Sequence, residues 1–136
     1  MTARAARAVR STLLPRSLAL VAALAVACTS ATLLPDRPAD IAGVVTSVQP
    51  GATPARPSAV RIEANPAEES GSPKMVLAVT LETAIVDRRE GEPRAIEKEA
   101  LRVGDRVEAW VTGPVQESYP SRATAEAIVV VGRAAP

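Results

Sequence analysis

Short segments in which apolar and polar residues alternate limit the folds open to this chain. Residues 59–63 place Val60 and Ile62 on one face and Arg61 and Glu63 on the other. A period of two residues is that of a β-strand with one face buried. The last such segment ends in Ile-Val-Val-Val, a run that suits a strand buried on both faces. We predict strands over residues 41–48, 59–63, 75–81, 106–112 and 124–131.

Two of these segments carry further expectations about side-chain direction. In the third, Leu77, Val79 and Leu81 fall on one side, and the pattern continues to Ile85. In the fourth, Trp110 falls on the face opposite to the inward-pointing residues, which are Val107, Ala109 and Val111.

The order of these elements predicts the fold class. Between the third and fourth strands, residues 96–101 make at most about two turns of helix. Three strands, a short helix and two more strands is the order of an OB-fold. We therefore expect a mainly all-β domain over residues 41–133, a small five-stranded OB-like barrel with one short helix between strands 3 and 4. A small open sandwich is the alternative.

The N-terminus has the order of an export signal. Residues 1–17 contain four arginines and no carboxylate, and the nine residues 18–26 are all apolar. Nine apolar residues are about half of the roughly 20 that a spanning helix needs. We therefore predict a signal peptide over residues 1–27 rather than a permanent transmembrane helix.

Cys28 follows this apolar run at the expected cleavage position. Small residues before a cysteine are typical of a lipobox, and Ala25 and Ala27 also fit an ordinary Ala-x-Ala signal. Both interpretations place cleavage between Ala27 and Cys28. We expect the Cys28 sulfur to be lipidated, with fatty acyl chains such as palmitate, rather than a free thiol in an exported chain. Cys28 is the only cysteine, so no disulfide can form within the chain.

The segments around the domain fit an anchored protein. Residues 28–40 contain Pro35 and Pro38 without a regular period, and we predict a lipidated terminus and tether there, with a tail at residues 134–136. From Cys28 onward the formal net charge is −3. The expected location is the cell envelope, on the outer side of the cytoplasmic membrane or in the outer membrane.

One stretch carries a resemblance to a known family. It comprises Leu-x-Val-Gly-Asp-x-Val at residues 101–107, then Trp110, Gly113 and Glu-Ser-Tyr-Pro at residues 117–120. With Ile-Ala-Gly-Val at residues 41–44, it resembles the YobA-like family, domain of unknown function 3221, of small bacterial exported proteins. The resemblance implies a small β-barrel-like domain in the envelope and no assigned activity.

Glu117, Ser118, Tyr119 and Pro120 allow two interpretations. In the structural one, the Tyr119 ring lies across a barrel end, its hydroxyl bonds a backbone group, and Pro120 fixes the entry of the last strand. In the functional one, Trp110, Glu117 and Tyr119 line a candidate binding cleft, with aromatic faces for stacking and a carboxylate for a polar ligand.

Several kinds of chemistry are disfavoured by composition. The chain has no histidine, which excludes a His-based triad and imidazole metal ligation. A Ser72 pair with Lys74 or Lys98 falls in loops and a polar segment. The loop carboxylates lack EF-hand spacing and are expected to be solvated. We predict no metal and no cofactor, and the acidic mature chain with two aromatics predicts no nucleic-acid binding.

The sequence therefore favours a non-enzymatic envelope lipoprotein that acts as an interaction or ligand-binding module. Its expected partners are the membrane, through the lipid anchor, and an unknown envelope protein or small ligand. Alternatives are a carboxylate-dependent hydrolase, pairing Glu117 with Glu108 or Asp105 within the roughly 10 Å that glycosidase pairs span, and a purely structural spacer.

Overall fold

A computed structural model describes residues 34–135, which are almost entirely strands and loops. The expected signal peptide, its cleavage site after Ala27 and the lipid site at Cys28 lie outside the described residues. The elements are β1 (Ile41–Gln49), β2 (Ser58–Glu63), β3 (Lys74–Val79), β4 (Ala84–Asp87), β5 (Arg94–Ala95), the 3-10 turn η1 (Lys98–Ala100), β6 (Asp105–Gln116) and β7 (Ser121–Arg133).

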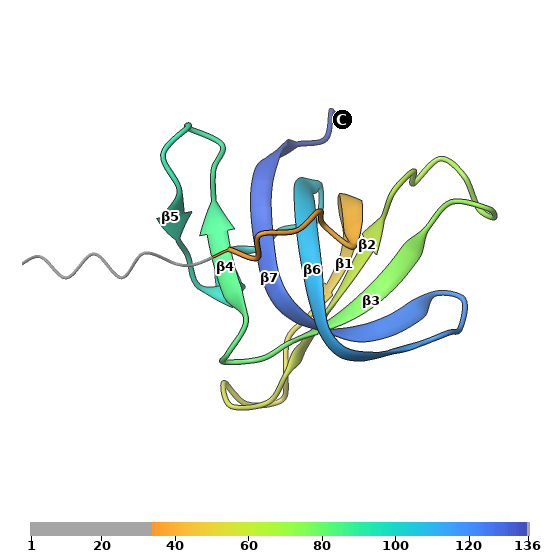
Figure 1. Ribbon diagram of the computed structural model, residues 1–136, viewed down its shortest axis with the longest axis horizontal. Helices are drawn as coiled ribbons and strands as arrows, with labels where there is room; N and C mark the ends of the chain where they lie inside the picture. Colours follow the sequence, from red (N-terminus) through yellow and green to blue (C-terminus); the bar gives the residue numbers. More distant parts are fainter. Residues whose placement is uncertain (1–33, 136) are drawn as a thin grey trace, which may run out of the picture. The chain divides into compact units, whose positions relative to one another are not determined.

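Five of the strands close into a barrel, which confirms the predicted architecture (Figure 1). The antiparallel pairs β3–β2, β2–β1, β1–β6 and β6–β7 follow one another around the barrel. The parallel pairing of Met75–Ala78 in β3 with Ser121–Thr124 in β7 completes the circle. Closure leaves these strands without free edges.

β1 pairs with a different neighbour along each part of its length. It pairs with β6 through Ile41–Val44 and with β2 through Val44–Gln49. A Cβ at Gly43 would lie 2.3 Å from the backbone oxygen of Glu63, so only glycine allows β2 to approach this closely. Thr46 then forms a bulge between Val45 and Ser47, and bulges increase the local bend of a strand.

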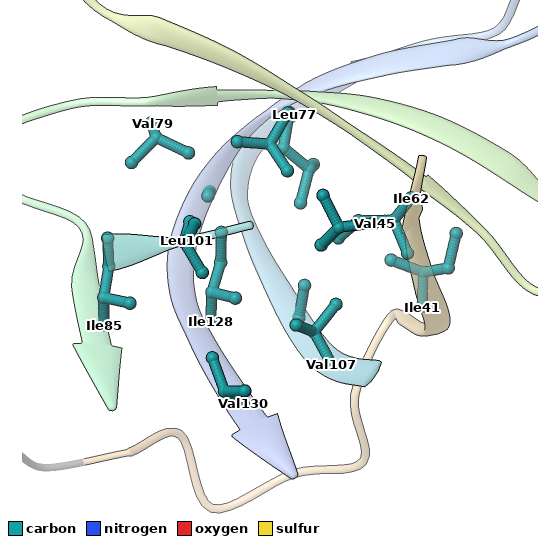
Figure 2. Close-up of a cluster of buried hydrophobic side chains, with 13 residues drawn as sticks. Ile41, Val45, Ile62, Leu77, Val79, Ile85, Leu101, Val107, Ile128 and Val130 are labelled. Carbon is teal, nitrogen blue, oxygen red and sulfur yellow. The ribbon is translucent and has the colours of Figure 1, made fainter. Parts of the chain in front are cut away.

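The barrel interior is aliphatic, as a chain without phenylalanine requires (Figure 2). Burial of each of these Val, Leu or Ile side chains stabilises the folded state by about 1.5–3 kcal/mol relative to leaving the side chain exposed. Ile128 and Val130 of β7 point into this core, whereas Ala127 and Val129 belong to a second cluster outside the barrel wall. The prediction that the Ile-Val-Val-Val run is buried on both faces is therefore confirmed through Val130.

The connection between β3 and β6 differs from the predicted helix. Most of it is a β-hairpin of β4 and β5, and the helix is reduced to the single 3-10 turn η1. β4 pairs in parallel with Ala127–Val130 of β7. Ile96 and Leu101 are too few apolar residues to bury a helical face, and the 3-10 turn places Leu101 in the barrel core instead.

The third strand is also shorter than its pattern suggested. β3 ends at Val79, and the chain turns where the Thr83 hydroxyl accepts a hydrogen bond from the Thr80 amide at 3.0 Å. Leu81 is 75% exposed, so its expected inward position is wrong. Ile85 is buried, but from the separate strand β4.

No helix in the described range is both long and apolar enough to cross a bilayer.

Candidate functional site

Leu34–Asp40, part of the expected tether, lies on the barrel wall and crosses β7 and β6 before entering β1 (Figure 1). The Asp40 amide donates to the Ala109 carbonyl at 2.9 Å. Leu34 and Ala39 pack on the second apolar cluster, which contains Trp110. This part of the expected tether is therefore a wall segment of the folded domain.

Trp110 is the centre of that wall. It has the predicted outward direction, yet it is only 6% exposed because the N-terminal segment and β4 cover it. Its indole Nε1 donates a hydrogen bond to the Arg37 carbonyl at 2.7 Å. A covered and satisfied indole has no free face for stacking, so Trp110 has a structural role here.

A cluster of charged side chains lies beside a β-bulge at Trp110 and Val111, between β6 and β7. Trp110 faces Ala127 and Val111 faces Ala125, which leaves Glu126 as the extra residue of β7. The Val111 amide donates to Asp40 Oδ2 at 2.8 Å. Arg37 donates to Asp40 at 2.7 Å and to Glu126 at 2.8 Å. The hydrogen bond from Arg37, followed by that from the Val111 amide, lowers the pKa of Asp40.

Tyr119 stands at the β6–β7 hairpin and lines a hollow to which Trp110 does not contribute. Its hydroxyl lies 3.2 Å from the backbone carbonyl oxygen of Glu69 and 3.4 Å from that of Ser72, and these two acceptors share its single donor proton. This is the backbone bonding that the structural interpretation expects. Tyr119 as a residue is 60% exposed, beside a hollow of about 260 Å³ that Lys74, Met75 and other residues line.

Lys74, which lines this hollow, forms an ion pair with Glu63. Lys74 Nζ is 3.2 Å from Glu63 Oε2, and both side chains are nearly buried, at 12% and 11% exposure. The Thr46 hydroxyl donates to the other Glu63 oxygen at 3.0 Å. Lys74 Nζ also lies 6.0 Å from the centre of the Tyr119 ring, within cation–π range. The Tyr119 ring therefore lies above a fixed positive charge.

Glu117 is exposed in the hairpin and lines neither the Trp110 cluster nor the Tyr119 hollow. The structure therefore does not bring Trp110, Glu117 and Tyr119 into one cleft. Tyr119 is the member of the set that borders a hollow.

The carboxylates considered for hydrolysis lie apart. Asp105 and Glu108 belong to the first part of β6, and Glu117 follows its last residue. At about 3.3 Å per residue, nine or more strand residues separate them by well over the roughly 10 Å of glycosidase pairs. Asp105 Oδ2 accepts the Arg102 amide at 2.9 Å, and Glu108 pairs with Arg88 at 3.2 Å. This geometry does not support paired-carboxylate hydrolysis.

Other polar groups have structural partners. The Ser72 hydroxyl accepts the Asn65 amide at 2.9 Å, Lys74 pairs with Glu63, and Lys98 donates to the Pro54 carbonyl at 2.8 Å. Within residues 34–135 no hydrogen bond joins Ser72 to either lysine. Asp87 accepts from Arg89 at 2.6 Å, and this contact, with the Arg89 amide, lowers the Asp87 pKa to about 2. Residues 34–135 contain no group of three ligand side chains placed to hold a metal ion.

A second hollow, of about 290 Å³, lies on the outer face of the barrel, and Pro120 forms part of its lining. Arg61 of β2 and Arg122 of β7 line it. The sequence showed Arg61 pointing outward from its strand, but nothing in a linear pattern pairs it with a residue 61 positions later. This surface was missed because the parallel β3–β7 pairing creates it.

The comparison with known families concerns the C-terminal part of this domain. Residues 94–132 match the family of proteins of unknown function DUF3221. The match runs from β5 to the end region of β7 and includes the turn before β6 and the Tyr119 hairpin. The resemblance to domain of unknown function 3221 is confirmed there, and the YobA-like assignment stays a prediction. No curated protein and no solved structure matches the chain.

Within the DUF3221 match, the described contacts explain several residues structurally. Gly104 has a φ of 93°, which glycine adopts readily, and Asp105 closes this turn by accepting the Arg102 amide. Trp110 fixes the N-terminal segment, and Tyr119 fixes the loop that contains Glu69 and Ser72. The matched segment thus supplies attachment points for the rest of the barrel.

Proposed function

We propose that this chain is a membrane-anchored envelope lipoprotein whose barrel is a non-enzymatic interaction or ligand-binding module. The observation that carries the binding role is the exposed Tyr119 ring beside a hollow, above the Lys74–Glu63 ion pair. An aromatic face next to a fixed polar pair suits recognition of a polar ligand. Asp105 and Glu108 of β6 lie far along the strand from Glu117, so they give no competing catalytic arrangement of the type considered.

Anchoring is supported by the sequence around Cys28 and by the position of Leu34. If Cys28 is acylated, five residues separate it from the part of the chain that lies on the barrel. At about 3.5 Å per residue, this stretch spans roughly 20 Å at most. The module would therefore act close to the membrane surface.

The anchor is tested by mass spectrometry of the full chain after expression in a bacterial host. The expected result is a mature N-terminus at Cys28 that carries acyl chains, with the protein in the membrane fraction. Cys28→Ser should lose the acyl chains and leave the membrane fraction. An unmodified Cys28 thiol, or retention of the uncut N-terminal segment, would contradict the anchor.

The binding role is tested by cross-linking in intact cells, with a photoreactive residue in place of Tyr119. Matched control cells carry the same photoreactive residue at Val131, which is exposed on β7 away from the hollow. We expect a discrete adduct from position 119 that is absent from position 131. Equal adduct patterns from both positions would contradict a binding role for this hollow.

A further inference from the structure

Two arginines flank one valine on the outer face of the barrel. Val76 of β3 is the register partner of Arg61 on β2 and of Arg122 on β7. Neighbouring strands lie about 4.8 Å apart, so the two arginine Cα atoms are separated by roughly 10 Å across the valine. Long side chains from these positions can meet over Val76.

The hollow between them has a mixed lining. Ala59, Val76 and Pro120 supply apolar surface, and Ser47 and Gln49 supply hydrogen-bonding groups. Its volume of about 290 Å³ is near the lower end of the range for small-molecule sites. None of the described residues that line it carries a carboxylate. Two positive charges without an acid are notable in a mature chain of net charge −3.

The arginines are only weakly engaged by the protein itself. Arg61 Nε is 3.9 Å from Glu63 Oε1, beyond hydrogen-bond distance, and that carboxylate is already held by Lys74 and Thr46. Within residues 34–135, Arg122 forms no ion pair. Both guanidinium groups therefore retain donors for an outside acceptor.

We propose that this hollow binds an acidic sugar unit, with the ligand carboxylate held between Arg61 and Arg122. Guanidinium groups bind carboxylates through paired, charge-assisted hydrogen bonds. Ser47 and Gln49 can bond the sugar hydroxyls, and Val76 can cover the apolar C–H face of the ring. The inference names a ligand class for the proposed binding module and adds a site distinct from the Tyr119 hollow.

The test is titration calorimetry of the full chain in mild detergent with tetragalacturonate, compared with neutral galactotetraose and with inorganic phosphate. We expect binding of tetragalacturonate that weakens with added salt, and at least roughly ten-fold weaker binding of the other two probes. Arg61→Gln and Arg122→Gln should each weaken tetragalacturonate binding by roughly ten-fold or more. Arg122→Lys should recover only part of the loss, because lysine keeps the charge without the paired donors.

Arg106→Gln is the matched control, since Arg106 is an exposed arginine of β6 that lines a different hollow. It should leave the affinity unchanged, and circular dichroism should show all variants folded. Equal affinity for the neutral sugar, equal affinity for phosphate, or unchanged binding in a folded Arg61→Gln, Arg122→Gln double variant would each overturn the proposal. A failed titration would leave the Cys28 mass and the position-119 adduct unaffected, so the two proposals fail separately.

Discussion

Trp110 donates its indole hydrogen bond to the backbone carbonyl of Arg37, a residue 73 positions earlier in the chain. This contact joins the segment before the first strand to the centre of β6. The indole is covered by apolar residues from β4, β7 and the N-terminal segment. The folded domain therefore begins before β1, at least as early as Leu34.

Replacing Trp110 should destabilise the domain strongly. Trp110→Ala should cost about 3–5 kcal/mol of unfolding free energy, because it removes a large buried side chain. Trp110→Phe should cost less, although it leaves the Arg37 carbonyl without its donor. Denaturant unfolding measures both. Val115→Ala, at an exposed position of the same strand, should stay within about 0.5 kcal/mol, and a Trp110→Ala variant of equal stability would refute the assigned role.

The close approach of β1 and β2 predicts an effect of a single methyl group. Gly43→Ala would place Cβ 2.3 Å from the Glu63 carbonyl oxygen, and relief of that clash should cost about 1–3 kcal/mol. Gly132→Ala is the matched control, because its Cβ would meet no atom within 4 Å. Thermal unfolding should separate the two variants, and equal melting temperatures would contradict the packing described.

The Asp87 carboxylate predicts loss of stability in acid. Its pKa in the folded chain is lowered from 3.8 to about 2. The stabilisation is therefore present above about pH 4 and lost as the pH falls through about 2. Asp87→Asn should lower the free energy of unfolding by about 1–2 kcal/mol at pH 7, a figure that allows for solvent screening of the half-exposed Arg89. It should also reduce the loss of stability as the pH falls from about 4 to about 2.

Urea unfolding at a series of pH values measures this dependence. Glu92→Gln, in the loop that follows Asp87, is the control, because Glu92 makes no ion pair within the described residues. If stability falls equally in acid with and without Asp87→Asn, other carboxylates govern the acid dependence.

The Tyr119 hydroxyl predicts a local effect rather than a global one. Tyr119→Phe keeps the ring but removes the bonds to Glu69 and Ser72, and should cost about 0.5–1.5 kcal/mol. Hydrogen exchange should become faster in the loop between β2 and β3 and stay unchanged in β6. Faster exchange throughout the barrel would instead show that the hydroxyl supports the whole fold.

The alternation of apolar and polar residues was sufficient to locate the barrel strands, because successive side chains of a strand point to opposite faces. Val60 and Ile62 are fully buried as their spacing required. Leu81 follows the same period but lies in the turn after β3, because the alternation does not show that the strand ends at Val79, where the Thr80 amide bonds the Thr83 hydroxyl. The helix predicted over residues 96–101 is reduced to a 3-10 turn because Ile96 and Leu101 are too few apolar residues to bury a helical face, and Leu101 packs in the barrel core instead.

What the sequence determined by itself was the aliphatic composition of the core and the order of the five barrel strands along the chain, because both can be read from composition and short-range alternation without knowing which strands pair. Tertiary structure decided the rest. Trp110 is covered because Leu34–Asp40 and β4 pack on the outer wall, and Tyr119 and Trp110 are separated by the course of β6. Arg61 and Arg122 become neighbours across Val76 because β3 and β7 pair in parallel to close the barrel, and no local period encodes a pairing between such distant strands.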